Sequence, residues 1–227
     1  QRGVITAVAT NGAGAIHDFE IAMWGKTSED VARHLADGTF GMCSDTADAM
    51  NEAASRGAKD REGLGECLGR ALSERPAPNL DASILGSAYG LGIPATVHVA
   101  LGTDIVHQHA SADGAAIGDT SLRDFRILSE VVGGLEGGVI MNIGSAVILP
   151  EVFLKALSVA RNLGAATGAF TAIGLDMNEP YRATLNIIAR PTAEHGMGIA
   201  LRGRHEILLP LLWASVRGEL AGWRQGR

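Results

Sequence analysis

The sequence predicts an α/β fold: a doubly wound, mostly parallel, twisted sheet with helices on both of its faces. Short runs rich in β-branched residues alternate with helical patterns, which is the order expected when a crossover helix follows each strand. The runs are apolar throughout, as is typical of parallel strands covered on both sides. The expected strands are Val4–Ala9, Ala95–Leu101, Gly138–Ile143, Gly168–Leu175 and Ala183–Ala189.

Helices are predicted where capping residues flank an apolar pattern of helical period. The markers are Ser or Asp at the start, acidic residues in the first turn, Pro at the first helical position and Gly after the end. The segments that carry such markers are Ser28–Leu35, Thr120–Val132, Pro150–Leu163 and His205–Leu220. The last of them is apolar through Ile207–Trp213, so we expect it to pack on the sheet.

We expect a single domain over residues 1–227, because the length and the 46% hydrophobic content suit one large globular core. The stretch from Thr39 to Pro78 is polar, rich in small residues and helical in tendency. It predicts a helical insertion that serves as a subunit contact or a lid. Since Gln1 begins the chain without an initiator Met and leads directly into an apolar strand, we expect an N-terminal segment to be absent from this sequence.

Composition excludes several classes of partner. A net charge of −6 without a Lys/Arg cluster argues against nucleic acid. Neither a run of about 18 apolar residues nor a signal peptide occurs, so we expect no membrane partner. Cys43 and Cys67 lack the spacing of a disulfide framework or a zinc site, which favours a reducing, cytoplasmic location.

The first strand leads into a glycine-rich loop of the kind that can bind phosphate. In open parallel sheets, ligands bind beyond the carboxyl ends of the strands. Here Thr10, Asn11, Gly12 and Ala13 precede a helix that carries His17. Glycine allows a phosphate to approach the backbone, and a helix N-terminus supplies partial positive charge. The dinucleotide fingerprint GxGxxG is not met, so a plain strand-to-helix turn is the alternative.

The second strand is followed by the densest polar cluster in the chain: Asp104, His107, His109 and Asp113. In an extended segment, both imidazoles of the HxH pattern would share one face and could hold a metal together with a carboxylate. The histidines could equally bind a substrate or act as general acid or base near neutral pH. Surface histidines without a function are the third interpretation.

The later strands also end in candidate site residues. Gly144, Ser145 and Ala146 would allow close approach of a cofactor, and Glu151 lies in the first turn of the next helix, where simple capping is the alternative. A glycine-spaced loop that contains Glu194 and His195 follows the last expected strand. We expect His17, Glu151 and Glu194 to bind substrate.

Taken in order, these loops resemble those of deoxyhypusine synthase, whose Rossmann-like parallel sheet binds a nicotinamide dinucleotide. The resemblance runs over most of the chain, and the colinear order of the motifs carries it. The matching segments are Val4–Asp18, Ala100–Asp104, Ile143–Pro150, Phe170–Ala172, Ala189–Pro191 and Leu209–Leu212.

The resemblance implies an NAD pocket, an amine substrate near Asp113, and a homo-oligomer whose active sites form between subunits. The apolar segment Leu208–Trp213 fits such a dimer or tetramer. The residues implied to line the NAD pocket are Thr10, Asn11, Gly12, Ala13, Asp104, Gly144, Ser145, Ala146, Thr171 and Ala172.

One departure from that family changes the expected chemistry. The family passes the aminobutyl group of spermidine through an imine on an enzyme lysine, which lies shortly after Ala-Arg-Pro. The corresponding stretch here, Glu194–Ile199, contains no lysine, and neither imidazole nor thioether forms an imine. The sequence therefore predicts a related protein that does not transfer the aminobutyl group.

Three functions remain open at this stage. The leading hypothesis is NAD-dependent hydride transfer on a small polar substrate, with His107, His109 or His195 as the proton carrier. The first alternative is a non-catalytic nucleotide sensor or scaffold. The second is a metal-dependent enzyme with Asp104, His107 and His109 as ligands, centred on the cluster that also includes Asp113.

Overall fold

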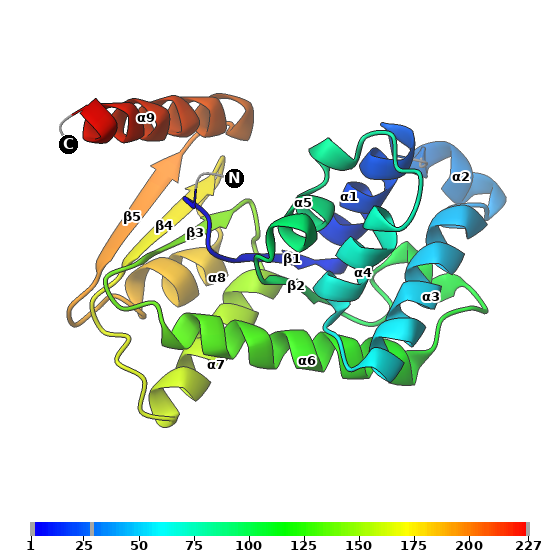
Figure 1. Ribbon diagram of the computed structural model, residues 1–227, viewed down its shortest axis with the longest axis horizontal. Coiled ribbons are helices and arrows are strands. Elements are labelled where there is room, and N and C mark those ends of the chain that lie inside the picture. The colour runs from blue at the N-terminus through cyan, green and yellow to red at the C-terminus, as the bar shows by residue number, and fades with distance from the viewer. Residues whose placement is uncertain (1–2, 28–29, 226–227) are drawn as a thin grey trace. The chain divides into compact units, whose positions relative to one another are not determined.

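The computed structural model describes residues 3–27 and 30–225 and confirms the α/β class (Figure 1). The chain divides into two compact units, Gln1–Val131 and Val132–Arg227, where the sequence predicted one domain. In the described residues, the strands form two parallel sheets, one of two strands in the first unit and one of three in the second.

The sheet of the first unit pairs β1 (Val8–Asn11) with β2 (Ala95–His98) in parallel, with Val8 opposite Ala95. The strand begins later than the predicted Val4–Ala9. It leads directly into α1 (Gly12–Trp24), whose start is capped by Asn11. The helix ends at Gly25, which adopts a left-handed φ of 71° that glycine tolerates without strain.

Helices complete the first unit: α2 (Val31–Asp37), α3 (Ser44–Asp60), α4 (Leu64–Ser73), α5 (Ile84–Leu91) and α6 (Gly114–Gly133), with the short 3₁₀ turns η1 (Leu80–Ala82) and η2 (Ile105–Gln108). The predicted cap Ser28 lies outside the described residues, and Asp30 caps α2 instead. The predicted helix Thr120–Val132 is confirmed as part of α6, which ends just inside the second unit.

The segment from Thr39 to Pro78 is helical as predicted, but it belongs to the core of the first unit. Its helices α3 and α4 contribute buried residues such as Met50, Leu68 and Leu72 to the same cluster as Phe19 of α1. At Gly65, a Cβ would lie 2.1 Å from the carbonyl oxygen of Ala95, so α4 packs directly on β2. The small residues that suggested an insertion are those that permit this close packing.

The second unit contains a parallel sheet of order β3-β4-β5, formed by β3 (Val139–Ile143), β4 (Thr171–Asp176) and β5 (Met197–Arg202). Figure 1 shows these strands side by side. Val139 of β3 pairs with Thr171 of β4, which in turn pairs with Met197 of β5. The helices are α7 (Ile148–Asn162), α8 (Tyr181–Ala183), a π-helical turn η3 (Thr184–Ala189) and α9 (His205–Gln225).

The predicted strand Ala183–Ala189 is wrong, since this segment is helical, and the last strand is β5. The packing of Ile188 explains both the wrongly predicted strand and the missed strand β5. A Cβ at Gly198 of β5 would lie 2.7 Å from Ile188, and one at Gly174 of β4 would lie 2.6 Å from it. Glycine therefore lets η3 lie close to the sheet, while the same residue weakens the sequence signal of β5.

None of the helices in the described part of the chain combines the length and the apolar character that crossing a bilayer requires.

Candidate functional site

The loops after β1 and β2 meet at Gly12 and Asp104. Gly12 is the first residue of α1, and Asn11 accepts the backbone N–H of Gly14 at 2.8 Å, so the helix starts where the strand ends. The Asp104 carboxylate lies against this start, because a Cβ at Gly12 would be only 1.8 Å from Oδ2 of Asp104. The positive end of the α1 dipole therefore faces a carboxylate.

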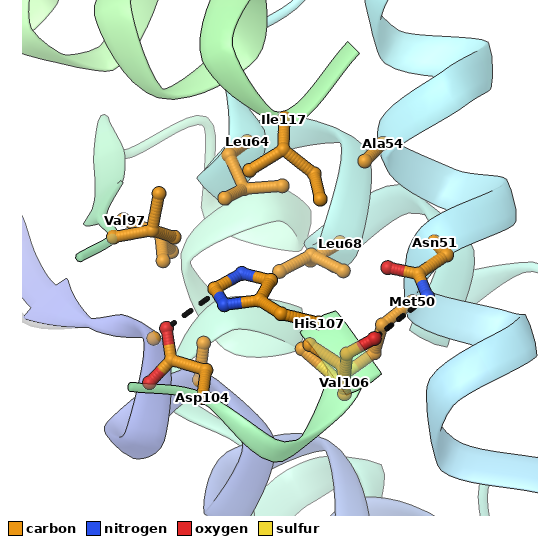
Figure 2. Close-up of a pocket in the computed structure, with 13 residues that line it drawn as sticks. Met50, Asn51, Ala54, Leu64, Leu68, Val97, Asp104, Val106, His107 and Ile117 are labelled. Atoms are coloured by element: carbon orange, nitrogen blue, oxygen red, sulfur yellow. Dashed lines mark hydrogen bonds and ion pairs between the residues drawn. The ribbon is translucent and has the colours of Figure 1, made fainter. Parts of the chain in front are cut away.

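Asp104 is buried without a full set of partners. It is 6% exposed, and its Oδ2 has no hydrogen-bond partner in the described residues. Burial raises the pKa of Asp104, while the nearby His107 acts in the opposite direction. Its Oδ2 lies 4.0 Å from Nε2 of His107, the interaction dashed in Figure 2. A buried acceptor of this kind favours a ligand that can donate a hydrogen bond.

The backbone selects one tautomer of His107. Nδ1 accepts the N–H of Gly102 at 3.3 Å, so the neutral imidazole carries its proton on Nε2, the nitrogen that faces Asp104. The His107 side chain is 9% exposed. The two side chains thus offer an acceptor and a donor that converge across a gap too long for a direct hydrogen bond.

A cavity of about 30 Å³ adjoins this pair, which is enough for a water-sized group. Figure 2 shows the imidazole of His107 pointing into it between α1, α3 and α4. Apart from Asn51 and the Asp104/His107 pair, the wall is apolar, so it strengthens electrostatic interactions inside. The remaining lining residues are Gly12, Ala15, Met50, Ala54, Leu64, Leu68, Val97, Val99, Val106 and Ile117.

The other members of the polar cluster point elsewhere. His109 donates from Nε2 to the carbonyl of Gly41 at 2.7 Å, and Asp113 accepts the N–H of Ala115 in the first turn of α6. The expectation that the HxH residues share one face is wrong, because η2 is a 3₁₀ turn rather than a strand. Within residues 3–27 and 30–225, no group of three or more His, Cys, Asp and Glu side chains is arranged to hold a metal.

Of the residues expected to line the NAD pocket, those that belong to the second unit do not lie together. The N–H of Gly144 donates to the carbonyl of Leu175, so this loop lies at the carboxyl end of the sheet. Thr171 and the fully buried Ala172 lie at the opposite end of β4, roughly 10–13 Å from Leu175 at the strand rise per residue. In the loop itself, the hydroxyl of Ser145 accepts the N–H of Leu149, and Ala146 is exposed.

The expected substrate-binding residues are exposed or already paired. Glu151 accepts hydrogen bonds from Asn186 at 2.9 Å and Arg182 at 3.2 Å, and it also pairs with Lys155. The hydrogen bond from Lys155 is the main reason that the pKa of Glu151 is lowered. The other two expected substrate-binding residues, His17 and Glu194, are exposed, and so is His195, which was expected as a proton carrier.

A second cavity of about 20 Å³ lies at the carboxyl end of β3, β4 and β5. Its polar lining includes Asn142, Asp176 and Arg202. Asn142 is buried and donates to the carbonyl of Ser145, while Arg202 donates to the carbonyl of Met177. Asp176 accepts the N–H of Asn178, so all three side chains hold the ends of the strands and the loops that follow them.

Three buried polar residues of the first unit were not selected from the sequence. His98, the last residue of β2, hydrogen-bonds with the Thr96 hydroxyl at 3.0 Å, and burial lowers its pKa to about 4. Asp124 of α6 and Asn51 of α3 hold neighbouring backbone groups. Only His98 had a usable signal, namely its place at the end of a strand.

No protein-family model matches the chain, and neither does any curated protein.

Proposed function

We propose that this chain binds NAD and catalyses hydride transfer on a small polar substrate, with the Asp104/His107 pair accepting the proton that the substrate releases. The observation that carries the proposal is the unpartnered Oδ2 of Asp104, which is buried against Gly12 and lies 4.0 Å from Nε2 of His107. Of the three histidines expected as proton carriers, His107 lines the cavity of about 30 Å³ and lies beside the Asp104 carboxylate.

The geometry of the pair suits a hydroxyl group or a neutral amine. One oxygen or nitrogen atom can bridge the 4.0 Å gap, because it would lie within hydrogen-bond distance of both side chains. That atom accepts from the Nε2–H of His107 and donates to Oδ2 of Asp104. Since burial raises the pKa of Asp104, this carboxylate is suited to accept the proton that an alcohol or amine releases on oxidation.

The cofactor half of the proposal is supported by the start of α1. A helix of 13 residues begins directly after a parallel strand, at a glycine whose missing side chain leaves room for the Asp104 carboxylate. Bound there, NAD would supply the hydride acceptor, and Thr10, Asn11 and Ala13 would be the residues beside it.

In the same proposal, the fold is doubly wound, Rossmann-like and of deoxyhypusine synthase type. The parallel pairing in both sheets and the helices between successive strands support this arrangement. We also propose a homo-oligomer, since α9 exposes large apolar side chains, including Ile207 at 57%, Leu211 at 61% and Trp213 at 48%.

Calorimetric titration with NAD tests the proposal, with Asp104→Asn and His107→Gln beside the control His109→Gln. We expect the wild type and the control to bind, and Asp104→Asn to bind at least tenfold more weakly. Neither heat nor a thermal shift at millimolar NAD would remove the cofactor half. NAD binding without turnover on a panel of small alcohols and amines would favour the nucleotide sensor.

A further inference from the structure

One side chain on α3 holds the segment that carries His107. Asn51 is 3% exposed, and its Nδ2 donates to the carbonyl of Val106 at 3.0 Å and to the hydroxyl of Ser111 at 3.1 Å. The two acceptors lie on either side of His107 in the sequence. Figure 2 shows Asn51 beside the cavity, with the dashed line to Val106 next to His107.

The segment needs such support because its own structure is weak. The 3₁₀ turn η2 has only 4 residues and lacks a side-chain hydrogen bond at its N-cap Asp104. A single 3₁₀ turn has poor hydrogen-bond geometry and leaves its carbonyls without partners inside the turn. Asn51 provides a donor to one of these carbonyls.

The hydrogen bond from Asn51 fixes the peptide group that joins Val106 to His107. A fixed peptide plane sets the direction in which the His107 side chain leaves the backbone. The imidazole can then accept the N–H of Gly102 on Nδ1 while Nε2 faces Asp104. Asn51 lies 55 residues before Val106 in the sequence, and in the described residues it makes no hydrogen bond to the His107 imidazole.

We propose that Asn51 is a positioning residue that sets the tautomer of His107 and its placement on Asp104. The inference rests on the proposed function only because that function gives His107 a chemical task. His109 holds the same loop through Gly41, but its hydrogen bond lies on the far side of His107 and does not involve the Val106 peptide. His109→Gln is therefore a matched control.

The experiment is ¹⁵N NMR of the His107 imidazole at alkaline pH, where the ring is neutral, in the full chain. In the wild type we expect the proton to reside on Nε2. In Asn51→Leu and Asn51→Asp, which lose the donor, we expect the ratio of the Nδ1–H to the Nε2–H form to rise about fivefold, as expected for loss of one hydrogen bond. His98, elsewhere in the first unit, and the control His109→Gln should keep the wild-type signals.

An unchanged His107 tautomer in folded Asn51 variants would overturn the inference, because a purely structural role lowers stability without moving this signal. If the variants do not fold, the wild type still provides a test: a scalar coupling across the hydrogen bond from Asn51 Nδ2 to the Val106 carbonyl supports the positioning role, and its absence contradicts it. None of these measurements uses NAD or a substrate. A protein that fails to bind NAD but shows the tautomer change would refute the proposed function alone.

Discussion

The carboxylate of Asp104 occupies the space in which a side chain at Gly12 would lie, with only 1.8 Å between its Oδ2 and the ideal position of a Cβ. Gly12 begins α1 directly after β1, whereas Asp104 lies in the loop after β2. Because position 12 has no side chain, the Asp104 carboxylate can pack against the start of α1.

Replacing Gly12 with alanine should displace Asp104 from α1. The side chain of Asp104 is short and buried, so the added methyl group forces a shift that we expect to cost about 1–3 kcal/mol of unfolding free energy. NAD affinity should fall along with stability if the proposed function is right. Urea denaturation measures the first effect and calorimetry the second.

Gly118→Ala provides the matched control, because a Cβ at this exposed helical position meets nothing within 4 Å. It should raise the unfolding free energy by about 0.5–1 kcal/mol, the usual gain for alanine over glycine in a helix. Equal stabilities for Gly12→Ala and the wild type would show that Asp104 does not pack on Gly12.

The sequence allowed prediction of those elements whose signals are local. The strands β2 and β3 are β-branched and apolar, and α7 has a Pro in its first turn and a Gly beyond its end, so each was predicted within a few residues. Ala183–Ala189 carried the same apolar signal as a strand. Its helical state depends on Ile188 fitting over Gly174 and Gly198, which are distant in sequence.

In the candidate site, too, the contacts that are local in sequence could be predicted, and those between distant residues could not. Asp104 and His107 are three positions apart, so their proximity could be expected from sequence alone. The packing of Asp104 on Gly12 and the support from Asn51 join residues far apart in sequence, and no local pattern indicates them. The HxH pattern led to the wrong prediction that both imidazoles share one face, because the segment forms a 3₁₀ turn and not a strand.

Asp124 makes the stability of the protein depend on pH. Its Oδ2 accepts the N–H groups of Gly65 at 2.9 Å and Val97 at 2.7 Å, its Oδ1 has no partner in the described residues, and burial raises its pKa to about 7. The folded state therefore holds this proton more tightly than the unfolded state, whose pKa is near 3.8. The contribution of Asp124 to the free energy of unfolding is therefore fully present below the pKa of the unfolded state, and it is lost as the pH rises toward 7.

Asp124→Asn should remove this pH dependence, because an amide keeps the acceptor but carries no charge. Relative to the wild type, the variant should gain up to about 4 kcal/mol between pH 4 and pH 8, the equivalent of three pKa units. Urea denaturation across this range measures the slope. The control is Asp119→Asn, an exposed change on the same helix. Parallel curves for Asp124→Asn and wild type would contradict the assignment.

Leu68 supports the wall of the cavity beside His107. It is 0% exposed, so Leu68→Ala should cost about 2–5 kcal/mol through lost apolar burial and an enlarged cavity. Leu163→Ala, at a residue that is 80% exposed, should change the unfolding free energy by less than about 0.5 kcal/mol. Thermal and urea denaturation check both, and a similar effect at the two positions would be inconsistent with the described core.

The exposed apolar side chains of α9 predict self-association. We expect light scattering to give the mass of a dimer or tetramer, because such side chains are stabilised by burial against a second copy. Leu211→Glu and Trp213→Glu should shift the mass toward the monomer, whereas Arg217→Glu on the same helix should shift it less. A monomeric wild type at micromolar concentration would remove the proposal of a homo-oligomer.

Aminobutyl transfer is the reaction of deoxyhypusine synthase, the family to which the proposed function relates this chain. An imine-forming lysine is activated by desolvation or by a neighbouring cation beside the reacting atoms. The chain contains only Lys26, Lys59 and Lys155. Lys26 and Lys59 are exposed, and the side chain of Lys155 is 57% exposed and paired with Glu151. None of them lines the cavity beside Asp104 and His107.

We therefore expect no deoxyhypusine to form on a hypusine-bearing translation factor when the protein is supplied with spermidine and NAD. Loss of an imine-forming lysine removes the covalent step that divides one difficult reaction into two easier ones, so the rate should fall by orders of magnitude. Borohydride trapping followed by mass spectrometry gives the direct test, with a deoxyhypusine synthase that carries its lysine as the positive control. A reduced spermidine-derived adduct on Lys26, Lys59 or Lys155 would show that one of these exposed amines performs the task after all, and it would reverse the prediction.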